Sequence, residues 1–282
     1  MINLKSDIVF FGFGNMTKII INDLLTYGNT IICITDNAIT LEKKQTENLR
    51  FISYNELKKC TLISEKSFFT WRDRSKIEFP NTQIRTWLES DYFSTNKSFL
   101  LSSASVYKDS QIKQNESKDN LDSNKNEKYR LEQVLSSTMR TKNIHHLNLR
   151  ISNVYGSGLY YGFINSILYS LKNKTNLHIF KDTRIERDYI HITDVIYAIQ
   201  KLINLDVKVN TLNVSTGEGT TIANILGIFK NYGIALDKFT YIEEPIQIKF
   251  ASILDPSNLS KLIYWNPIKV PEGIQRCINA SF

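Results

Sequence analysis

Residues 7–36 read DIVFFGFGNMTKIIINDLLTYGNTIICITD, and this stretch decides the fold. The short apolar run that ends at Phe11 is typical of a strand buried on both faces. Residues 15–27 follow with apolar side chains at helical spacing and end at Gly28, a common helix terminator. Residues 30–35 form a second buried apolar run. Strand, helix and strand in this order predict a βαβ unit, which is right-handed by default.

The rest of the chain continues to alternate between strand and helix patterns. We expect strands at 51–54, 67–71, 98–103, 145–151, 177–180, 188–190, 211–214 and 239–243, and helices at 55–60, 81–92, 128–139, 163–172, 192–203, 221–232 and 271–279. Residues 108–126 are polar and predict a solvated loop. The alternation predicts an α/β fold with a doubly wound parallel sheet. The less regular part beyond Asn153 predicts a smaller C-terminal lobe.

The composition places the chain among ordinary globular proteins. Its 282 residues contain 35 Lys and Arg against 28 Asp and Glu, a formal charge of +7. This excess suits an anionic small substrate, and it is too modest to favour nucleic acid. Three widely spaced cysteines, Cys33, Cys60 and Cys277, show no metal-site spacing and indicate a reducing compartment. With no long apolar run and no signal-peptide pattern, we expect a soluble cytoplasmic protein without a membrane segment.

The turn between the first strand and the first helix carries the first functional signal. Gly12 would allow a tight turn, and Gly14 would let the backbone approach a pyrophosphate at the start of the helix, beside Asn15 and Met16. Thr17 stands where the third glycine of the dinucleotide fingerprint is expected. The alternative is an ordinary strand-to-helix turn, and the position between strand and helix favours nucleotide binding.

The end of the second strand carries the next signal. Asp36, with Asn37 beside it, stands where the ribose of a dinucleotide would lie. A carboxylate there accepts bonds from the ribose hydroxyls and repels a 2′-phosphate, which favours NAD over NADP. The alternative for Asp36 is a plain turn residue. Together with the glycine turn, this residue predicts NAD as the cofactor.

Several further motifs occur in a fixed order along the chain. They are Leu101-Ser-Ser-Ala-Ser-Val-Tyr107, Lys128-Tyr-Arg-Leu-Glu132, Arg150-Ile-Ser-Asn-Val-Tyr-Gly156, Arg187-Asp-Tyr-Ile-His-Ile-Thr-Asp194, Asn213-Val-Ser-Thr-Gly217 and Tyr264-Trp-Asn-Pro267. In this order they resemble the extended short-chain dehydrogenases/reductases, of the NAD-dependent nucleotide-sugar epimerase/dehydratase kind. The resemblance covers nearly the whole chain and implies a Rossmann-type fold with a smaller C-terminal substrate-binding lobe.

The resemblance also implies roles for single residues. Ser103 takes the position of the serine that polarises the reacting sugar oxygen, and Lys128 that of the lysine that binds the nicotinamide ribose. Thr70 takes a further cofactor position. The family's catalytic tyrosine lies four residues before the lysine, where this chain has Asn124. An asparagine amide does not titrate in the useful range, so Asn124 cannot accept a hydroxyl proton as a phenolate does.

This departure leaves three interpretations open. Another tyrosine takes over, with Tyr107, Tyr129, Tyr155 and Tyr161 as candidates from nearby motifs. Alternatively, the substrate supplies its own acid or base. Finally, the protein binds nucleotide and sugar without redox chemistry.

The substrate side follows from the resemblance in the same way. Asn153 takes the position that contacts the substrate diphosphate, and Arg187 that of an arginine that holds the phosphates through charge-assisted bonds. The alternative for Arg187 is a structural ion pair with Asp188. Where the family often has a further phosphate-binding arginine, this chain offers Lys249.

The sequence therefore predicts an NAD-dependent nucleotide-sugar epimerase, reductase or dehydratase. By analogy it would make an unusual sugar for a surface polysaccharide and form a homodimer. The NAD-binding domain is expected at 1–155 and 186–215, and the substrate-binding lobe at 156–185 and 216–282. The alternative function is a catalytically impaired NAD and nucleotide-sugar binding protein that acts as a sensor or a partner subunit.

Overall fold

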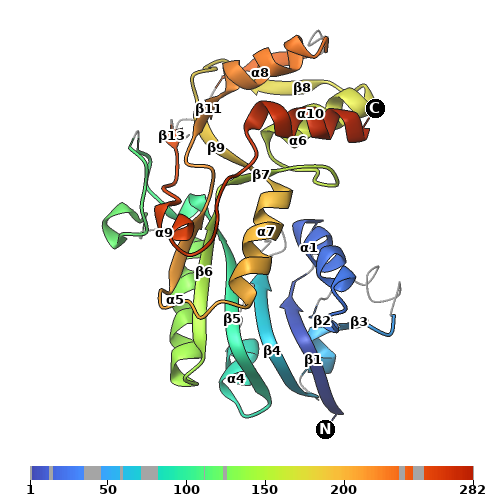
Figure 1. The fold of residues 1–282 in the computed structure, drawn as a ribbon, viewed down its shortest axis with the longest axis vertical. Helices are drawn as coiled ribbons and strands as arrows, with labels where there is room; N and C mark the ends of the chain where they lie inside the picture. Colours follow the sequence, from blue (N-terminus) through green and yellow to red (C-terminus); the bar gives the residue numbers. More distant parts are fainter. Residues whose placement is uncertain are drawn as a thin grey trace. The chain divides into compact units, whose positions relative to one another are not determined.

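The fold is taken from a computed structural model of the chain (Figure 1). The structure describes residues 2–12, 15–34, 46–57, 60–70, 82–110, 112–122, 126–234, 239–243 and 251–281. Five residues with expected site roles lie outside this part: Gly14, Asp36, Asn37, Asn124 and Lys249.

The described elements alternate between strand and helix. The strands are β1 Ile2–Phe11, β2 Ile31–Ile34, β3 Leu49–Ile52, β4 Cys60–Thr70, β5 Phe93–Ser103, β6 His145–Ile151, β7 Asn153–Tyr155, β8 Leu177–Phe180, β9 Glu186–His191, β10 Thr211–Val214, β11 Gly219–Thr221, β12 Phe239–Ile242 and β13 Ala251–Ser252. The helices are α1 Asn15–Thr26, α3 Tyr54–Leu57, α4 Thr82–Glu89, α5 Glu127–Thr141, α6 Phe163–Asn173, α7 Ile192–Ile203, α8 Ile222–Asn231, α9 Ser257–Ser260 and α10 Val270–Ser281.

The central sheet has seven strands in the order β10-β6-β5-β4-β1-β2-β3. The pairs β1–β2, β2–β3, β1–β4 and β4–β5 are all parallel. The prediction of a Rossmann-type parallel α/β sheet is confirmed. From β1 the chain first runs outward to β2 and β3, and then returns to β4 on the other side of β1. The carboxyl ends of β1 and β4 therefore lie at the switch point, where open sheets of this kind bind ligands.

The chain divides into two compact units. Unit 1 comprises Met1–Ser102, Ser123–Leu149 and Leu202–Thr211, and unit 2 comprises Ser103–Asp122, Arg150–Lys201 and Leu212–Phe282. Each unit is built from three separate segments of the sequence. Each also has its own apolar cluster of buried side chains.

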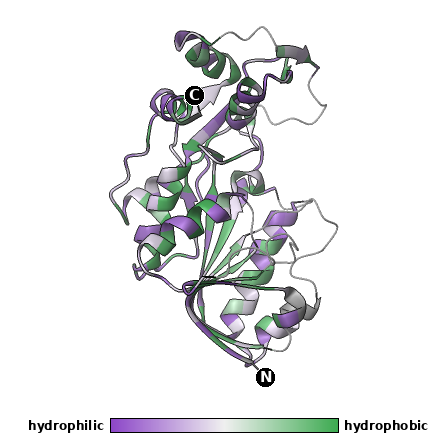
Figure 2. Ribbon diagram, turned by 90° about the vertical axis from the view of Figure 1, so that its right-hand side faces the viewer, coloured by the Kyte–Doolittle hydropathy of each residue, from purple (hydrophilic) through white to green (hydrophobic). Residues whose placement is uncertain are grey.

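The register of unit 1 is marked by a row of aromatic rings across three strands. Phe10, Phe68 and Phe99 are directly paired in β1, β4 and β5. Their rings stack at centroid distances of 4.9 Å and 4.7 Å, and all three are fully buried. Cross-strand aromatic pairs stabilise a sheet, and a slip by one residue would turn all three rings to the opposite face. Figure 2 shows the apolar colour running along the strands of the central sheet.

Unit 2 is built around strand β9. It pairs with β11, β13 and β7, and a separate two-stranded sheet joins β8 to β12. Helices α6, α8 and α10 supply most of the apolar cluster of this unit, which includes Ile167, Ile225, Phe229 and Ile274. The strands that flank β9 are short, so the functional residues of β9 lie close to loops.

The polar segment expected to be a solvated loop is more ordered than predicted. Gln114 is buried, and its backbone exchanges hydrogen bonds with Ile253 and Asp255. Glu116 accepts bonds from the backbone N–H of Asn213 and from the Asn258 side chain, both at 2.9 Å. From the sequence alone, such polar residues cannot be told from loop residues, because the backbone groups to which they bond are about 100 or more residues away.

Candidate active site

The turn after β1 requires a glycine for two separate reasons. Gly12 has φ +104°, and a Cβ atom at this position would lie 2.5 Å from Thr70 Oγ1 and 2.6 Å from the Thr70 carbonyl oxygen. The Thr70 hydroxyl donates to the Phe11 carbonyl at 3.1 Å, which fixes the end of β4 against the end of β1. The tight turn at this switch point therefore needs glycine, which agrees with the role expected of Gly12.

Helix α1 begins directly after this turn. Asn15 and Met16 are its first residues, and both are half-buried. The N–H groups of a first helical turn have no partners within the helix and favour anions. Asn15 and Met16 therefore lie where the phosphates of a cofactor would be stabilised, as the sequence predicts.

Lys128 lies in the first turn of α5. The Asn126 side chain caps this helix by accepting from the backbone N–H groups of Lys128 and Tyr129, at 3.0 Å and 3.3 Å. Burial lowers the pKa of the Lys128 ammonium. Within the described part of the chain, no hydrogen-bond acceptor or carboxylate pairs with this ammonium. The Lys128 side chain is half-buried, and an ammonium partly withdrawn from water is stabilised by hydrogen-bond acceptors, so this position suits a ligand that supplies them.

Ser103 ends β5 and begins a 3-10 turn, Ala104–Val106. Its Oγ accepts from the backbone N–H of Ser105 at 3.2 Å. This bond uses a lone pair, so the hydroxyl hydrogen can still be donated to a substrate oxygen. Ser103 is thus both the cap of this turn and a candidate donor.

Two of the four candidate tyrosines are locked in the core of unit 2. The Tyr107 hydroxyl donates to Asn213 Oδ1 at 2.6 Å and accepts from Arg150 Nη1 at 3.1 Å, and its side chain is fully buried. Tyr155 is also buried, and its hydroxyl lies against Gly273. Burial raises the Tyr155 pKa far above its usual range. Neither hydroxyl is placed to exchange a proton with a bound substrate.

The other two candidate tyrosines remain accessible. Tyr129 follows Lys128 on α5, and Tyr161 lies in the loop before α6; both are half-buried. Each can therefore reach solvent or a ligand, as an acid or base must.

The substrate-side residues gather on β7 and β9 of unit 2. Asn153 pairs with Tyr189 in the β7–β9 register, and its Nδ2 donates to the Asp188 carbonyl at 3.0 Å. The exposed Asn153 side chain keeps its oxygen and its second N–H for other partners. Arg187 is half-buried, and its Nη1 donates to the Glu186 carbonyl at 2.7 Å. Burial lowers the Arg187 pKa, while the charges of Tyr189 and Asp109 act in the opposite direction.

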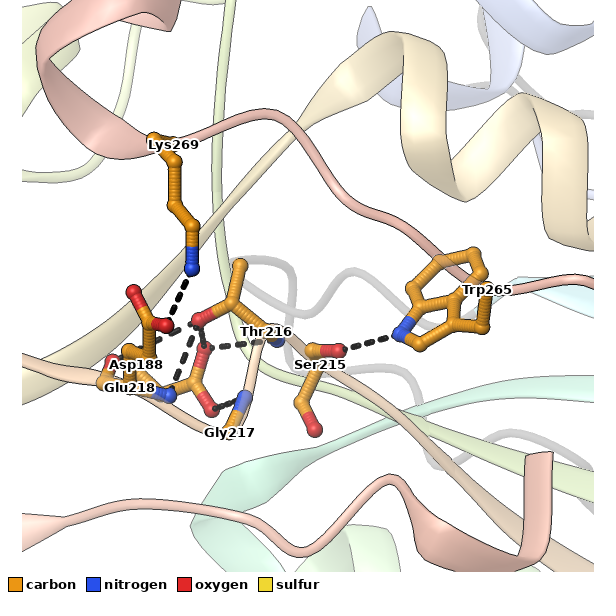
Figure 3. A network of polar contacts seen from close by, with 7 residues as sticks. All are labelled: Asp188, Ser215, Thr216, Gly217, Glu218, Trp265 and Lys269. Atoms are coloured by element: carbon orange, nitrogen blue, oxygen red, sulfur yellow. Dashed lines mark hydrogen bonds and ion pairs between the residues drawn. The ribbon is translucent and has the colours of Figure 1, made fainter. Parts of the chain in front are cut away.

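Asp188 is the centre of a polar network that the sequence did not reveal (Figure 3). One carboxylate oxygen accepts from Thr216 N and Oγ1 at 3.1 Å and 2.7 Å, and the other from Gly217 N at 3.0 Å. Burial raises the Asp188 pKa to about 6. Adjacent residues of a strand point to opposite faces, so Asp188 serves this network rather than pairing with Arg187.

Two further contacts hold the residues on either side of Thr216 and Gly217, the partners of Asp188. Trp265 Nε1 donates to the Ser215 carbonyl at 2.9 Å, and Lys269 forms an ion pair with Glu218 (Figure 3). Gly217 has φ +73°, which favours glycine at this turn. The Asn213–Gly217 motif is therefore held as one unit beside β9. Little in the sequence indicates this burial, because Asp188 stands directly after the charged residue Arg187.

His191 is a structural residue. Its Nδ1 is 2.7 Å from Thr193 Oγ1, and burial lowers its pKa to about 4. Among the described residues no group of three His, Cys, Asp or Glu side chains is arranged to hold a metal ion. No helix in the described part is both long and apolar enough to cross a membrane. The three cysteines are free and buried.

Residues 85–215 match the profile of the NAD-dependent epimerase/dehydratase family. The chain is also 26% identical to the dTDP-4-dehydro-6-deoxyglucose reductase of Escherichia coli over 142 residues, 48% of this chain and 44% of the reductase. The chain thus matches less than half of the length of this curated relative.

Solved structures show the same fold over almost the whole chain. The UDP-glucose 4-epimerase of Thermotoga maritima, solved with UDP-glucose, has a TM-score of 0.78 at 17% identity and 97% coverage of both chains. The UDP-glucuronic acid 4-epimerase of Bacillus cereus, solved with UDP-glucuronic acid and NAD, has a TM-score of 0.77 at 18% identity and 99% coverage of both chains. At these identities the likeness establishes the fold.

Proposed function

Because the chain carries a domain of the NAD-dependent epimerase/dehydratase family over residues 85–215, we propose that it is an NAD-dependent enzyme that modifies a nucleotide sugar. The reaction class is epimerisation, reduction or dehydration. One observation carries this proposal best: the side chain of Lys128 is half-buried in the first turn of α5, and its ammonium has no partner among the described residues. A ribose hydroxyl pair would supply the acceptors that this ammonium lacks.

The cofactor would be NAD, which takes up and returns a hydride. The tight turn at Gly12 packs against Thr70 at the switch point of the sheet, the place where sheets of this kind bind the phosphates of a dinucleotide. Asn15 and Met16 would lie at the phosphates, and Lys128 would bind the nicotinamide ribose. Gly14, Asp36 and Asn37 belong to the same proposal on their sequence positions.

The substrate would be held by residues of unit 2. Ser103 would donate its hydroxyl hydrogen to the reacting sugar oxygen. Asn153 would bind the diphosphate through its exposed amide, and Arg187 would bind the phosphates by charge-assisted bonds. Lys249 would add a further positive charge. These roles are supported by the exposed amide of Asn153 and the half-buried guanidinium of Arg187.

The general acid and base would differ from the family's usual tyrosine. Asn124 cannot take this role. Tyr107 and Tyr155 are fully buried, which leaves Tyr129 and Tyr161, or an acidic group of the substrate itself. If position 124 shapes catalysis, Asn124→Tyr will change the turnover or the range of sugar nucleotides accepted. Unchanged turnover with every sugar nucleotide would contradict this.

The wider setting is also proposed. The enzyme would work in the cytoplasm, without nucleic acid or membrane, on an unusual sugar for a surface polysaccharide. It would form a homodimer through α4 and α5, which pack against each other in unit 1. Light scattering coupled to size-exclusion chromatography would give twice the chain mass for a dimer, and a single chain mass would contradict it.

The second candidate is a binding protein that keeps the NAD pocket but performs no redox step. Asn124 favours this function, since it removes the usual acid and base. Turnover of any sugar nucleotide that disappears in Lys128→Ala would exclude it.

The first test is mass spectrometry of small molecules released when the purified protein is denatured. Retained NAD or NADH would support the cofactor site and indicate chemistry that regenerates its own cofactor, or a stably loaded binding protein. An empty protein that binds added NADH would favour a reductase, which exchanges its cofactor at every turnover. A protein that neither retains nor binds NAD(H) would overturn the proposal.

A further inference from the structure

A buried polar contact joins the end of β5 to α5 within unit 1. Ser102 Oγ donates to Glu132 Oε1 at 2.6 Å. The Glu132 side chain is 1% exposed and Ser102 is 7% exposed. This distance is typical of a hydroxyl donating to an ionised carboxylate. Burying a carboxylate is costly, so a buried Glu132 indicates that the hydrogen bond with Ser102 has a function.

Glu132 lies one helical turn after Lys128. Four residues advance an α-helix by about 6 Å and bring the side chains to the same face. Asn126 holds the other end of this turn by capping the N–H groups of Lys128 and Tyr129. The turn that carries Lys128 is therefore fixed before the lysine by Asn126 and after it by Glu132.

The position of the Lys128 ammonium depends on this fixation. No described residue bonds to it, so the backbone of α5 determines where it lies. Leu131, Leu135 and Met139 pack α5 against the sheet, but apolar contacts are non-directional and tolerate a small rotation or shift of the helix. The Ser102–Glu132 hydrogen bond is directional and links this helical turn to a central strand.

We propose that Ser102 and Glu132 are positioning residues for Lys128, and that their hydrogen bond sets the affinity of the protein for its cofactor. This inference rests on the proposed function, in which Lys128 binds the nicotinamide ribose. Without the hydrogen bond, the helix would keep its apolar packing, but the ammonium would no longer be held at the ribose. A hydrogen bond from an ammonium is worth about tenfold or more in affinity, and it is lost when the ammonium moves out of reach of its acceptor.

The test uses three variants of the pair and one control. Ser102→Ala removes the donor and Glu132→Leu removes the acceptor, whereas Glu132→Gln keeps an acceptor oxygen at the same distance along the side chain. Thr138→Val is the matched control, since this buried hydroxyl on the same helix has no hydrogen-bond partner among the described residues. Thermal unfolding shows which variants are folded.

Two readouts separate positioning from a purely structural role. The first is the dissociation constant for NADH, measured by calorimetry. The second is the rate at which acetic anhydride acetylates Lys128, measured by mass spectrometry relative to Lys97. Lys97 is a suitable internal reference because its ammonium bonds to the Leu202 carbonyl, away from α5.

We expect Ser102→Ala and Glu132→Leu to weaken NADH binding by about tenfold or more, the worth of a hydrogen bond from an ammonium, and to change the Lys128 acetylation rate. Glu132→Gln should retain binding to within about threefold, and Thr138→Val should match the unmodified protein. If Glu132→Leu does not fold, Ser102→Ala decides the test. Unchanged NADH affinity and an unchanged Lys128 rate in folded Ser102→Ala would overturn the positioning role while the proposed function stands. If the unmodified protein fails to bind NADH, the proposed function falls, and with it the role in cofactor affinity.

Discussion

Replacing Gly12 by alanine tests the turn at the switch point most directly. Gly12 has φ +104°, and an L-residue in a positive-φ conformation costs about 1–2 kcal/mol. The new Cβ would also lie 2.6 Å from the Thr70 carbonyl oxygen, so the main chain of β4 would have to move. Such overpacking adds about 1–3 kcal/mol. We therefore expect Gly12→Ala to lower the free energy of unfolding by about 2–5 kcal/mol.

The matched control is Gly28→Ala. Gly28 has φ +76°, and a Cβ atom there would meet nothing within 4 Å. This variant bears only the conformational cost of about 1–2 kcal/mol. Urea denaturation followed by circular dichroism gives both values, and their difference isolates the close approach to Thr70. Equal losses of stability in the two variants would refute the reasoning, since the contact with Thr70 would then cost nothing.

Three further predictions follow from buried polar groups. Burial lowers the His146 pKa to about 4, so the stability that its neutral form provides is present above pH 6.5 and is lost as the pH falls through about 4. The loss of stability amounts to about 3 kcal/mol, since one pKa unit corresponds to about 1.4 kcal/mol. Urea denaturation at pH values from 7 to 4 measures this loss, and the loss should be smaller in His146→Gln, which cannot take up the proton. Asp188→Asn should lower the free energy of unfolding at pH 7 by about 1–3 kcal/mol, because the new NH₂ group would face the N–H donors that the carboxylate accepts from. Calorimetric melting measures this, and an unchanged melting temperature would contradict it. Tyr155→Phe should leave the melting temperature nearly unchanged, because the buried hydroxyl has no partner among the described residues, and it should partly rescue Gly273→Ala, whose Cβ would collide with that hydroxyl.

The start of the fold could be predicted because its signals are local. The first strand, the first helix and the second strand each carry an uninterrupted apolar pattern, and they appear as β1, α1 and β2. The beginnings of the long strands were missed for the same reason. β1 begins at Ile2 rather than at 7, β4 at Cys60 rather than at 67, and β5 at Phe93 rather than at 98. Their first halves alternate between buried and exposed positions, so polar residues such as Lys66 interrupt the apolar run.

The candidate site was predictable only where a motif marks it. Gly12, Thr70, Ser103 and Lys128 stand at the ends of strands or the start of a helix, as the motif order implied. The partners of Asp188 could not be predicted, because Thr216 and Leu254 lie 28 and 66 residues farther along the chain. Sequence patterns report which residues are buried, but not which donors a buried carboxylate finds.

The division of each unit into three sequence segments has a consequence for synthesis. The last segment of unit 1 is Leu202–Thr211, and that of unit 2 extends to the end of the chain. Strands β1 to β5 pair with strands that are close to them in the sequence, but β6 has to wait for β10, which is made about 60 residues later. Contacts such as Tyr107 with Asn213, 106 residues apart, form late and slow folding. The free edge of β6 in the nascent sheet must therefore be protected from other chains until β10, Thr211–Val214, has emerged.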